Sequence, residues 1–250
     1  MKDLIKRAQK YPSIPQKILN TIGIIKITQN RERLIPNIRQ LVDYLILNGD
    51  YEAALKQLEV LKKMIEDHHS LEAYYHKNRG IIFRKQGLFE KSLKEFETAL
   101  SLYQELKDKS GKADIIGEMG LIHIIKGEYI RALELVEKSR DLYKKKKEKV
   151  GMGIASANMA LIYELQGEIS KALNYYFDAL KLLEKEGHPV ISGKVLSNLS
   201  AIYFEKGDIF KALSYLDEAV KIHELLDDDL GKKLAAIRVS SHQKMNNLIV

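Results

Sequence analysis

The sequence predicts an all-α fold, a right-handed superhelical α-solenoid of about five helix-turn-helix repeats. A glycine-led turn returns at a nearly fixed spacing, with apolar residues at helical spacing on both sides of it. Short polar stretches separate one unit from the next in the same phase. The turn glycines are 38, 40, 40 and 40 residues apart, and they are Gly49, Gly87, Gly127, Gly167 and Gly207. A period of this size is typical of stacked units that bury their apolar faces against one another.

Each unit is predicted to be a helix, a tight turn and a second helix. In the second unit, Phe83 precedes Gly87 by four residues, and Phe89, Leu93 and Phe96 follow it by two, six and nine. These offsets keep one face of a helix apolar. Glycine readily adopts the left-handed conformation that ends a helix, so it marks the turn. An acidic residue lies within three positions after each turn glycine, near the start of the second helix, where it suits the positive end of the helix dipole.

A mostly small residue lies seven positions before each turn glycine, which predicts that another helix approaches the first helix closely there. These residues are Val42, Gly80, Gly120, Ala160 and Ser200.

The repeats are expected to occupy most of the chain. We expect an N-terminal helical extension over residues 1–35, repeats over 36–227 and a C-terminal capping helix over 228–250. The expected repeats are 36–68, 69–108, 109–148, 149–188 and 189–227. The capping helix carries an apolar stripe that leaves a homodimer through the capping helices open.

Composition argues against several classes of function. The absence of cysteine excludes disulfides, thiolate metal sites and cysteine nucleophiles. The seven histidines do not have metal-ligand spacing, and no phosphate-binding loop or nucleophile elbow is found. We therefore expect no enzymatic activity, no metal and no cofactor. The lack of a long apolar run or a signal-peptide pattern predicts a cytoplasmic protein without a membrane span.

The net charge of +7 raises the alternative of a nucleic-acid partner. Much of the excess lies in the run Lys144–Lys147, at the predicted end of a helix, where lysines complement the negative end of the helix dipole. We therefore interpret the run as a solvated helix end and keep nucleic-acid binding through a basic face as a remote alternative.

The repeat resembles that of the tetratricopeptide repeat family. The resemblance rests on the small residue, an aromatic residue three positions later (Phe83, Tyr163, Tyr203), the turn glycine and a small residue five positions after it. The usual repeat of the family has 34 residues. A 40-residue step is similar to the subclass found in kinesin light chains, spindle-orientation adaptors and bacterial peptide-pheromone receptors.

The resemblance implies a concave groove lined by the first helices, and a protein or peptide as partner. A row of polar residues nine positions before the glycines would face it, and carboxamides there could bind an extended peptide backbone. Basic residues around the groove would favour acidic as well as apolar anchors in the partner. The expected binding residues are Lys77, Asn78, Ile81, Glu118, Leu121, Asn158, Leu161, Lys194, Asn198, Phe204 and Arg238.

Two points stay open from the sequence. Each asparagine of the row could instead hydrogen-bond to a neighbouring helix, and the apolar groove residues could instead belong to the core. The predicted function is an interaction scaffold or adaptor. A peptide-responsive regulatory sensor, like the pheromone receptors, is the first alternative.

Overall fold

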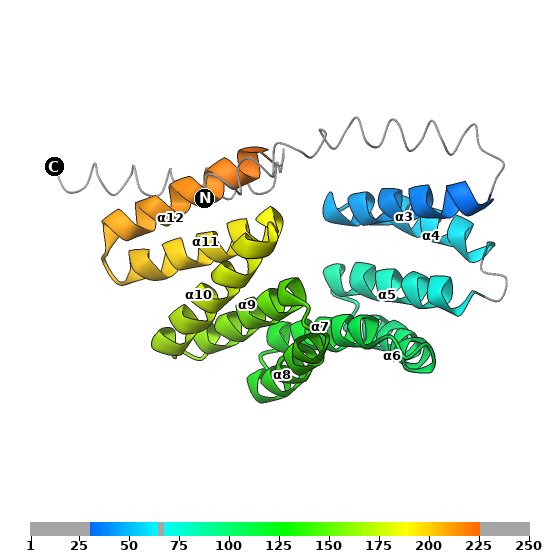
Figure 1. Ribbon diagram of the computed structural model, residues 1–250, viewed down its shortest axis with the longest axis horizontal. Coiled ribbons are helices and arrows are strands. Elements are labelled where there is room, and N and C mark those ends of the chain that lie inside the picture. The colour runs from blue at the N-terminus through cyan, green and yellow to red at the C-terminus, as the bar shows by residue number, and fades with distance from the viewer. Residues whose placement is uncertain (1–30, 65–67, 226–250) are drawn as a thin grey trace. The chain divides into compact units, whose positions relative to one another are not determined.

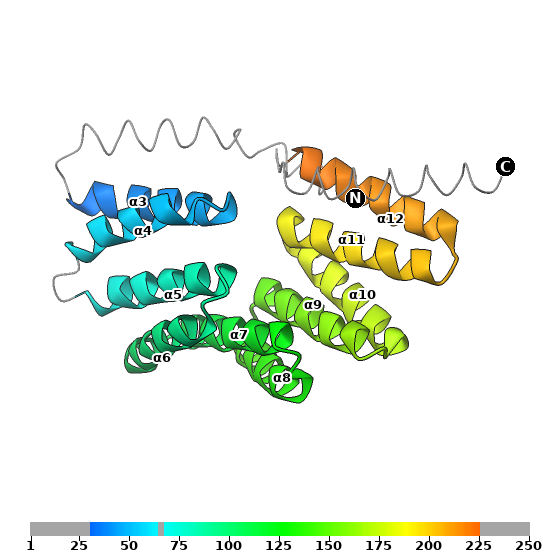
Figure 2. The same cartoon turned by 180° about the vertical axis from the view of Figure 1, so that it is seen from behind.

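The computed structural model describes residues 31–64 and 68–225, and these residues form ten helices and no strand. The helices alternate as first and second members of five pairs, and the members of each pair pack side by side (Figures 1 and 2). The predicted all-α repeat solenoid is confirmed. The described residues up to Lys147 belong to one compact unit and those from Glu148 to Leu225 to another, here called the N-terminal and the C-terminal unit.

The N-terminal unit holds three helix pairs and the C-terminal unit two. The N-terminal pairs are α3 (Arg31–Leu47) with α4 (Tyr51–Lys62), α5 (His69–Lys85) with α6 (Phe89–Glu105), and α7 (Lys109–Ile125) with α8 (Tyr129–Lys146). The C-terminal pairs are α9 (Lys149–Leu165) with α10 (Ile169–Glu186), and α11 (Pro189–Glu205) with α12 (Ile209–Leu225).

Some predicted features differ from the structure or fall outside it. The described part of α3 runs from Arg31, so it includes residues 31–35 of the expected N-terminal extension. Residues 1–30 of the expected N-terminal extension, the expected capping helix over 228–250 and Arg238 lie outside the described residues.

The five predicted glycines close the first helices as expected. Their φ angles are all positive, between 74° and 80°. At Gly87 the following amide, that of Leu88, donates a hydrogen bond to the carbonyl of Phe83 at 2.8 Å. This bond satisfies a carbonyl of the last helical turn that has no partner within the helix. Acidic residues then begin some of the second helices, and the Asp50 carboxylate accepts from the Ala53 amide at 3.1 Å.

Small residues let the two helices of a pair come close. A Cβ atom added to Gly80 of α5 would lie 2.5 Å from the Phe96 ring of α6, and one added to Gly120 would lie 2.9 Å from Val136. Where the helices meet, the Ser92 hydroxyl donates to the Gly80 carbonyl at 2.7 Å. The close approach predicted from the small residues is therefore present, and it fixes how the first helices are held on the second helices.

Candidate functional site

The candidate site in the N-terminal unit is the side on which α5 contacts α3 and α7, here called the first-helix face. Residues at related distances from the turn glycines meet there, because equivalent positions of stacked repeats lie next to each other. The face comprises Asp43, Tyr74, Lys77, Asn78, Ile81, Arg84, Asp114, Glu118, Leu121 and Ile125.

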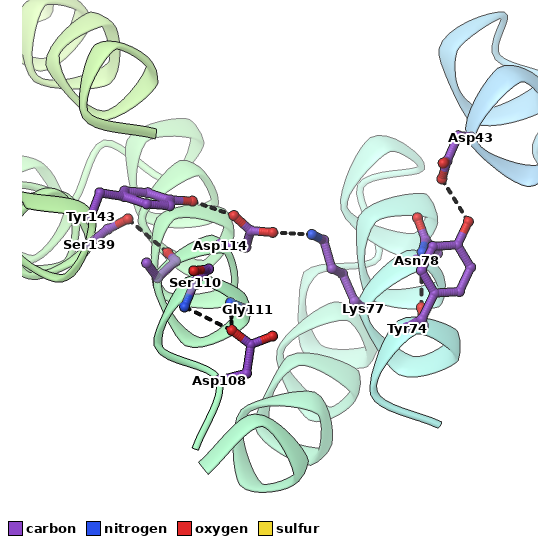
Figure 3. Close-up of polar contacts among 11 residues, drawn as sticks. Asp43, Tyr74, Lys77, Asn78, Asp108, Ser110, Gly111, Asp114, Ser139 and Tyr143 are labelled. Atoms are coloured by element: carbon purple, nitrogen blue, oxygen red, sulfur yellow. Dashed lines mark hydrogen bonds and ion pairs between the residues drawn. The ribbon is translucent and has the colours of Figure 1, made fainter. Parts of the chain in front are cut away.

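Tyr74 links α5 to α3. Its hydroxyl donates to the Asp43 carboxylate at 2.7 Å and lies 3.0 Å from the Arg39 carbonyl (Figure 3). The Arg39 guanidinium lies over the Tyr74 ring, 4.3 Å from its centroid. Burial, together with the Asp43 charge, raises the pKa of Tyr74 well above its ordinary value, so the hydroxyl stays protonated as a donor.

Asp114 of α7 joins three helices. Its carboxylate is ion-paired with Lys77 of α5 and accepts a hydrogen bond from the hydroxyl of Tyr143 on α8 (Figure 3). Burial disfavours the charged form of Lys77, but the neighbouring Asp114 carboxylate outweighs it, so the pKa of Lys77 is raised. Lys77 therefore remains a cation whose charge is matched within the chain.

A second ion pair crosses from α5 to α7 further along the face. Arg84 Nε donates to Glu118 Oε2 at 2.8 Å, and the two side chains are only 14% and 21% exposed. Lys77 and Arg84 are two of the cations that the sequence places around the groove. Both are paired inside the molecule, so neither offers an unmatched positive charge to a ligand.

An apolar strip runs beside these ion pairs, toward the turn glycines. Ile81 and Leu121 are half-buried, and Ile125 is 56% exposed. Ile81 also packs against the core clusters on both sides of α5. The core alternative therefore applies in part to Ile81, whereas Ile125 leaves most of its side chain accessible to a partner.

The predicted polar row is divided between internal bonds and free positions. Asn78 is 4% exposed and donates to the Tyr74 carbonyl of its own helix at 2.9 Å. In the C-terminal unit, Asn198 of α11 donates to the Tyr176 hydroxyl of α10 at 3.0 Å. Asn158 of α9 is half-buried, and its side chain forms no hydrogen bond with another described residue. The Asn158 carboxamide thus stays available to a partner.

The remaining predicted residues of the C-terminal unit keep part or most of their side chains exposed. Leu161 of α9 and Phe204 of α11 are half-buried, and Lys194 of α11 is exposed. The structure thus places every predicted site residue within residues 77–204 on a first helix, as the repeat pattern requires.

The sequence analysis missed the partners of the charged side chains. Asp114 lies 37 residues after Lys77, and Glu118 lies 34 residues after Arg84. Opposite charges separated by slightly less than one repeat are therefore the signal that would have found them. A further network on α4, α5 and α6 was also missed, and it comprises Glu59, Tyr75, His76, Arg79 and Glu95.

The described part of the chain holds neither a metal-site cluster nor a membrane-spanning helix. Residues 31–64 and 68–225 contain no group of three or more histidine, aspartate or glutamate side chains placed to hold a metal ion. Within those same residues, each helix is too short or too polar to cross a membrane.

Solved structures of similar fold include bacterial proteins. BtubC (BKLC) from P. vanneervenii is 18% identical with a TM-score of 0.58, and the alignment covers 91% of this chain and 92% of that one. The apo form of the quorum sensor NprR from B. thuringiensis is 16% identical with a TM-score of 0.54, covering 94% and 74%. NprR in complex with its cognate peptide NprX is 17% identical with a TM-score of 0.58, covering 99% and 74%. At these identities the likeness is one of fold.

Family models give the assignment. No curated protein matches the sequence. One tetratricopeptide repeat model matches residues 69–145 and 111–185, and a second matches residues 194–226. These matches cover more than half of the chain and coincide with the helix pairs from α5 to α12. The chain therefore belongs to the tetratricopeptide repeat family.

Proposed function

We propose that this protein is an interaction scaffold that binds a peptide or helix of a partner protein across its first helices. Stacked helix pairs expose long continuous surfaces, and the family and fold support protein–protein interaction as the general role. NprR, which has a similar fold, is known in complex with its cognate peptide, and this supports a peptide as the partner's binding element.

The observation that carries the proposal is the strip formed by Leu121 and Ile125 beside matched ion pairs. An isoleucine that is 56% exposed next to a half-buried leucine gives a partner apolar surface to cover. Because Lys77 and Arg84 are already paired, apolar anchors rather than acidic ones should dominate binding at α5 and α7.

Selection from a displayed random-peptide library tests the proposal. Peptides recovered on the wild-type chain should be rich in apolar residues and should lose binding to the double variant Leu121→Ser, Ile125→Ser. Ile130→Ser is the matched control, because Ile130 is 78% exposed but lies on the second helix of the same repeat.

The proposal requires the single variant Ile125→Ser to weaken peptide binding and Ile130→Ser to leave it unchanged, while both fold equally well. Circular dichroism should show the same thermal transition for Ile125→Ser and Ile130→Ser, since both side chains are largely exposed. If the recovered peptides bind all variants equally, or bind only when Ile130 is present, the first-helix face is not the binding surface.

A further inference from the structure

One edge of the N-terminal unit is lined with lysines. Because consecutive helices run antiparallel, the C-terminal ends of α4, α6 and α8 lie at the same edge as the N-terminal ends of α5 and α7. These lysines are exposed, apart from the half-buried Lys112. We call them the lysine edge, and they are Lys62, Lys63, Lys107, Lys109, Lys112, Lys144, Lys145, Lys146 and Lys147.

The charge of this edge is not matched inside the molecule. None of its lysines forms an ion pair with another described residue, and the Lys62 ammonium instead lies 5.5 Å from the centroid of the Tyr75 ring. Elsewhere in the same unit Lys56, Lys77 and Lys126 are each paired with a carboxylate. Nine lysines without an ion-pair partner among the described residues therefore gather at the connections between repeats, where they outnumber the neighbouring carboxylates of Glu105, Asp108 and Glu148.

The backbone conformation at two positions of this edge makes lysine less favourable for stability than glycine. Lys107 and Lys147 have φ angles of 54° and 58°, in the left-handed region that disfavours residues with a Cβ atom. The same position in the C-terminal unit is Gly187, with φ of 71°. Glycine therefore fits this turn, and the two lysines hold a strained conformation where glycine would relieve it.

The helix dipole explains only part of the lysine edge. Lys144, Lys145 and Lys146 lie in the last turn of α8, where cations are favoured. Lys109 and Lys112 lie in the opening residues of α7, at the positive end of the dipole, where cations are disfavoured. Lysine thus stands at positions where the backbone conformation favours glycine, and at others where the helix dipole disfavours a cation.

We propose that the lysine edge binds a carboxylate-rich segment of a partner protein, separately from the first-helix face. Residues 104–112 and 144–147 contain no arginine, the residue that best matches phosphate groups with paired hydrogen bonds. Tyr103 and Tyr143, which adjoin the edge, are 9% and 8% exposed and offer no ring on which a base could stack. Clustered lysine charges without these features suit an acidic peptide rather than a nucleic acid.

Fluorescence anisotropy with a short labelled poly-glutamate peptide tests this. The double variant Lys107→Gly, Lys147→Gly should melt at a higher temperature, because the strain is relieved, and yet bind poly-glutamate about fivefold more weakly, as expected for the loss of two exposed charge contacts. Binding to the wild-type chain should vanish in about 1 M NaCl, where the screening length falls to about 3 Å.

The control variant removes two positive charges from the opposite edge of the same unit. Lys91 and Lys94 are exposed near the start of α6, at the opposite edge, and Lys91→Ala with Lys94→Ala should leave the poly-glutamate affinity unchanged. Equal losses in both double variants would overturn the proposal, since only net charge would then matter. Tighter binding of an oligothymidylate than of poly-glutamate at the same salt, or salt-sensitive self-association in place of peptide binding, would also overturn it.

Discussion

Asn198 of α11 donates its side-chain amide to the hydroxyl of Tyr176 on α10, at 3.0 Å. That hydroxyl in turn donates to Glu164 Oε2 of α9, at 2.6 Å. Burial and the Glu164 carboxylate raise the pKa of Tyr176 well above its ordinary value, so the hydroxyl remains a donor. The three residues form one directed chain of hydrogen bonds through the C-terminal unit, and the Asn198 amide is committed to it.

Asn158 and Asn198 occupy the same position in successive repeats, and the hydrogen bond to Tyr176 distinguishes Asn198 from Asn158. Asn198→Ala removes a bond to a buried hydroxyl and should lower the free energy of unfolding by about 1–2 kcal/mol. Asn158→Ala breaks no bond to another described residue and should change it by less than about 0.5 kcal/mol. Urea denaturation measures both. Equal destabilisation by the two substitutions would show that Asn158 is structural as well.

Close packing at Gly80 gives a second prediction. The added methyl group of Gly80→Ala would lie 2.5 Å from the fully buried Phe96 ring, so we expect a loss of about 1–3 kcal/mol from overpacking. Thermal or urea unfolding of Gly80→Ala, Phe96→Leu and the double variant measures the coupling. The loss in the double variant should be smaller than the sum of the two single losses.

Gly87→Ala is the control for this cycle. At Gly87 nothing lies within 4 Å of an added Cβ, but φ is +76°, so alanine there should cost about 1–2 kcal/mol through backbone strain alone. Its effect should add to that of Phe96→Leu without coupling. Coupling of equal size in both cycles would contradict the packing explanation.

Asp114 gives a third prediction, because it serves two partners on different helices. Asp114→Ala leaves the Lys77 charge and the Tyr143 hydroxyl without their acceptor, and should lower the unfolding free energy by about 2–3 kcal/mol. Glu52→Ala breaks an ion pair in which Glu52 is 82% and Lys56 is 70% exposed, so it should destabilise the protein far less than Asp114→Ala does. Chemical denaturation in low and high salt compares them. A similar small effect for both would show that the Asp114 contacts contribute little.

The helix pairs and their turns could be predicted because their causes are local. Glycine at a left-handed position and apolar residues at helical spacing act within one repeat, and the five turns lie where the sequence placed them. That residues 31–35 belong to α3 was harder to predict. Pro36 lies inside that helix, where its missing amide affects only the carbonyl of Glu32, so the proline does not end the helix.

The contacts of the candidate site could be predicted only in part. The repeat phase places Lys77, Asn78 and Glu118 on first helices, but their partners depend on how neighbouring repeats cross. Whether Asn78 faces a ligand or bonds to its own helix is decided by the local burial, which periodicity does not determine. The pairing of Arg84 with Glu118 likewise required the spatial offset between α5 and α7.

His188 gives the last prediction, which concerns pH. It precedes α11, and its Nδ1 is buried without a hydrogen-bond partner. Burial lowers the pKa of His188, and the positive charge of Lys194 adds to the lowering. The unfolded chain therefore takes up a proton more readily than the folded one. The contribution of His188 to stability is complete above its ordinary pKa of about 6.5 and is lost as the pH falls below it.

The free energy of unfolding should be measured on wild type and His188→Gln between roughly pH 7.5 and 5, the range in which histidine titrates. The difference between the two proteins isolates the contribution of His188 from those of the other histidines. The wild type should lose more stability than the variant as the pH falls, because only the wild type must bury a charge at this position. Lys194→Met should reduce the loss, since it removes the repulsion from the exposed ammonium. Parallel curves for wild type and His188→Gln would mean that His188 is solvated well enough in the folded protein to titrate as it does in the unfolded chain.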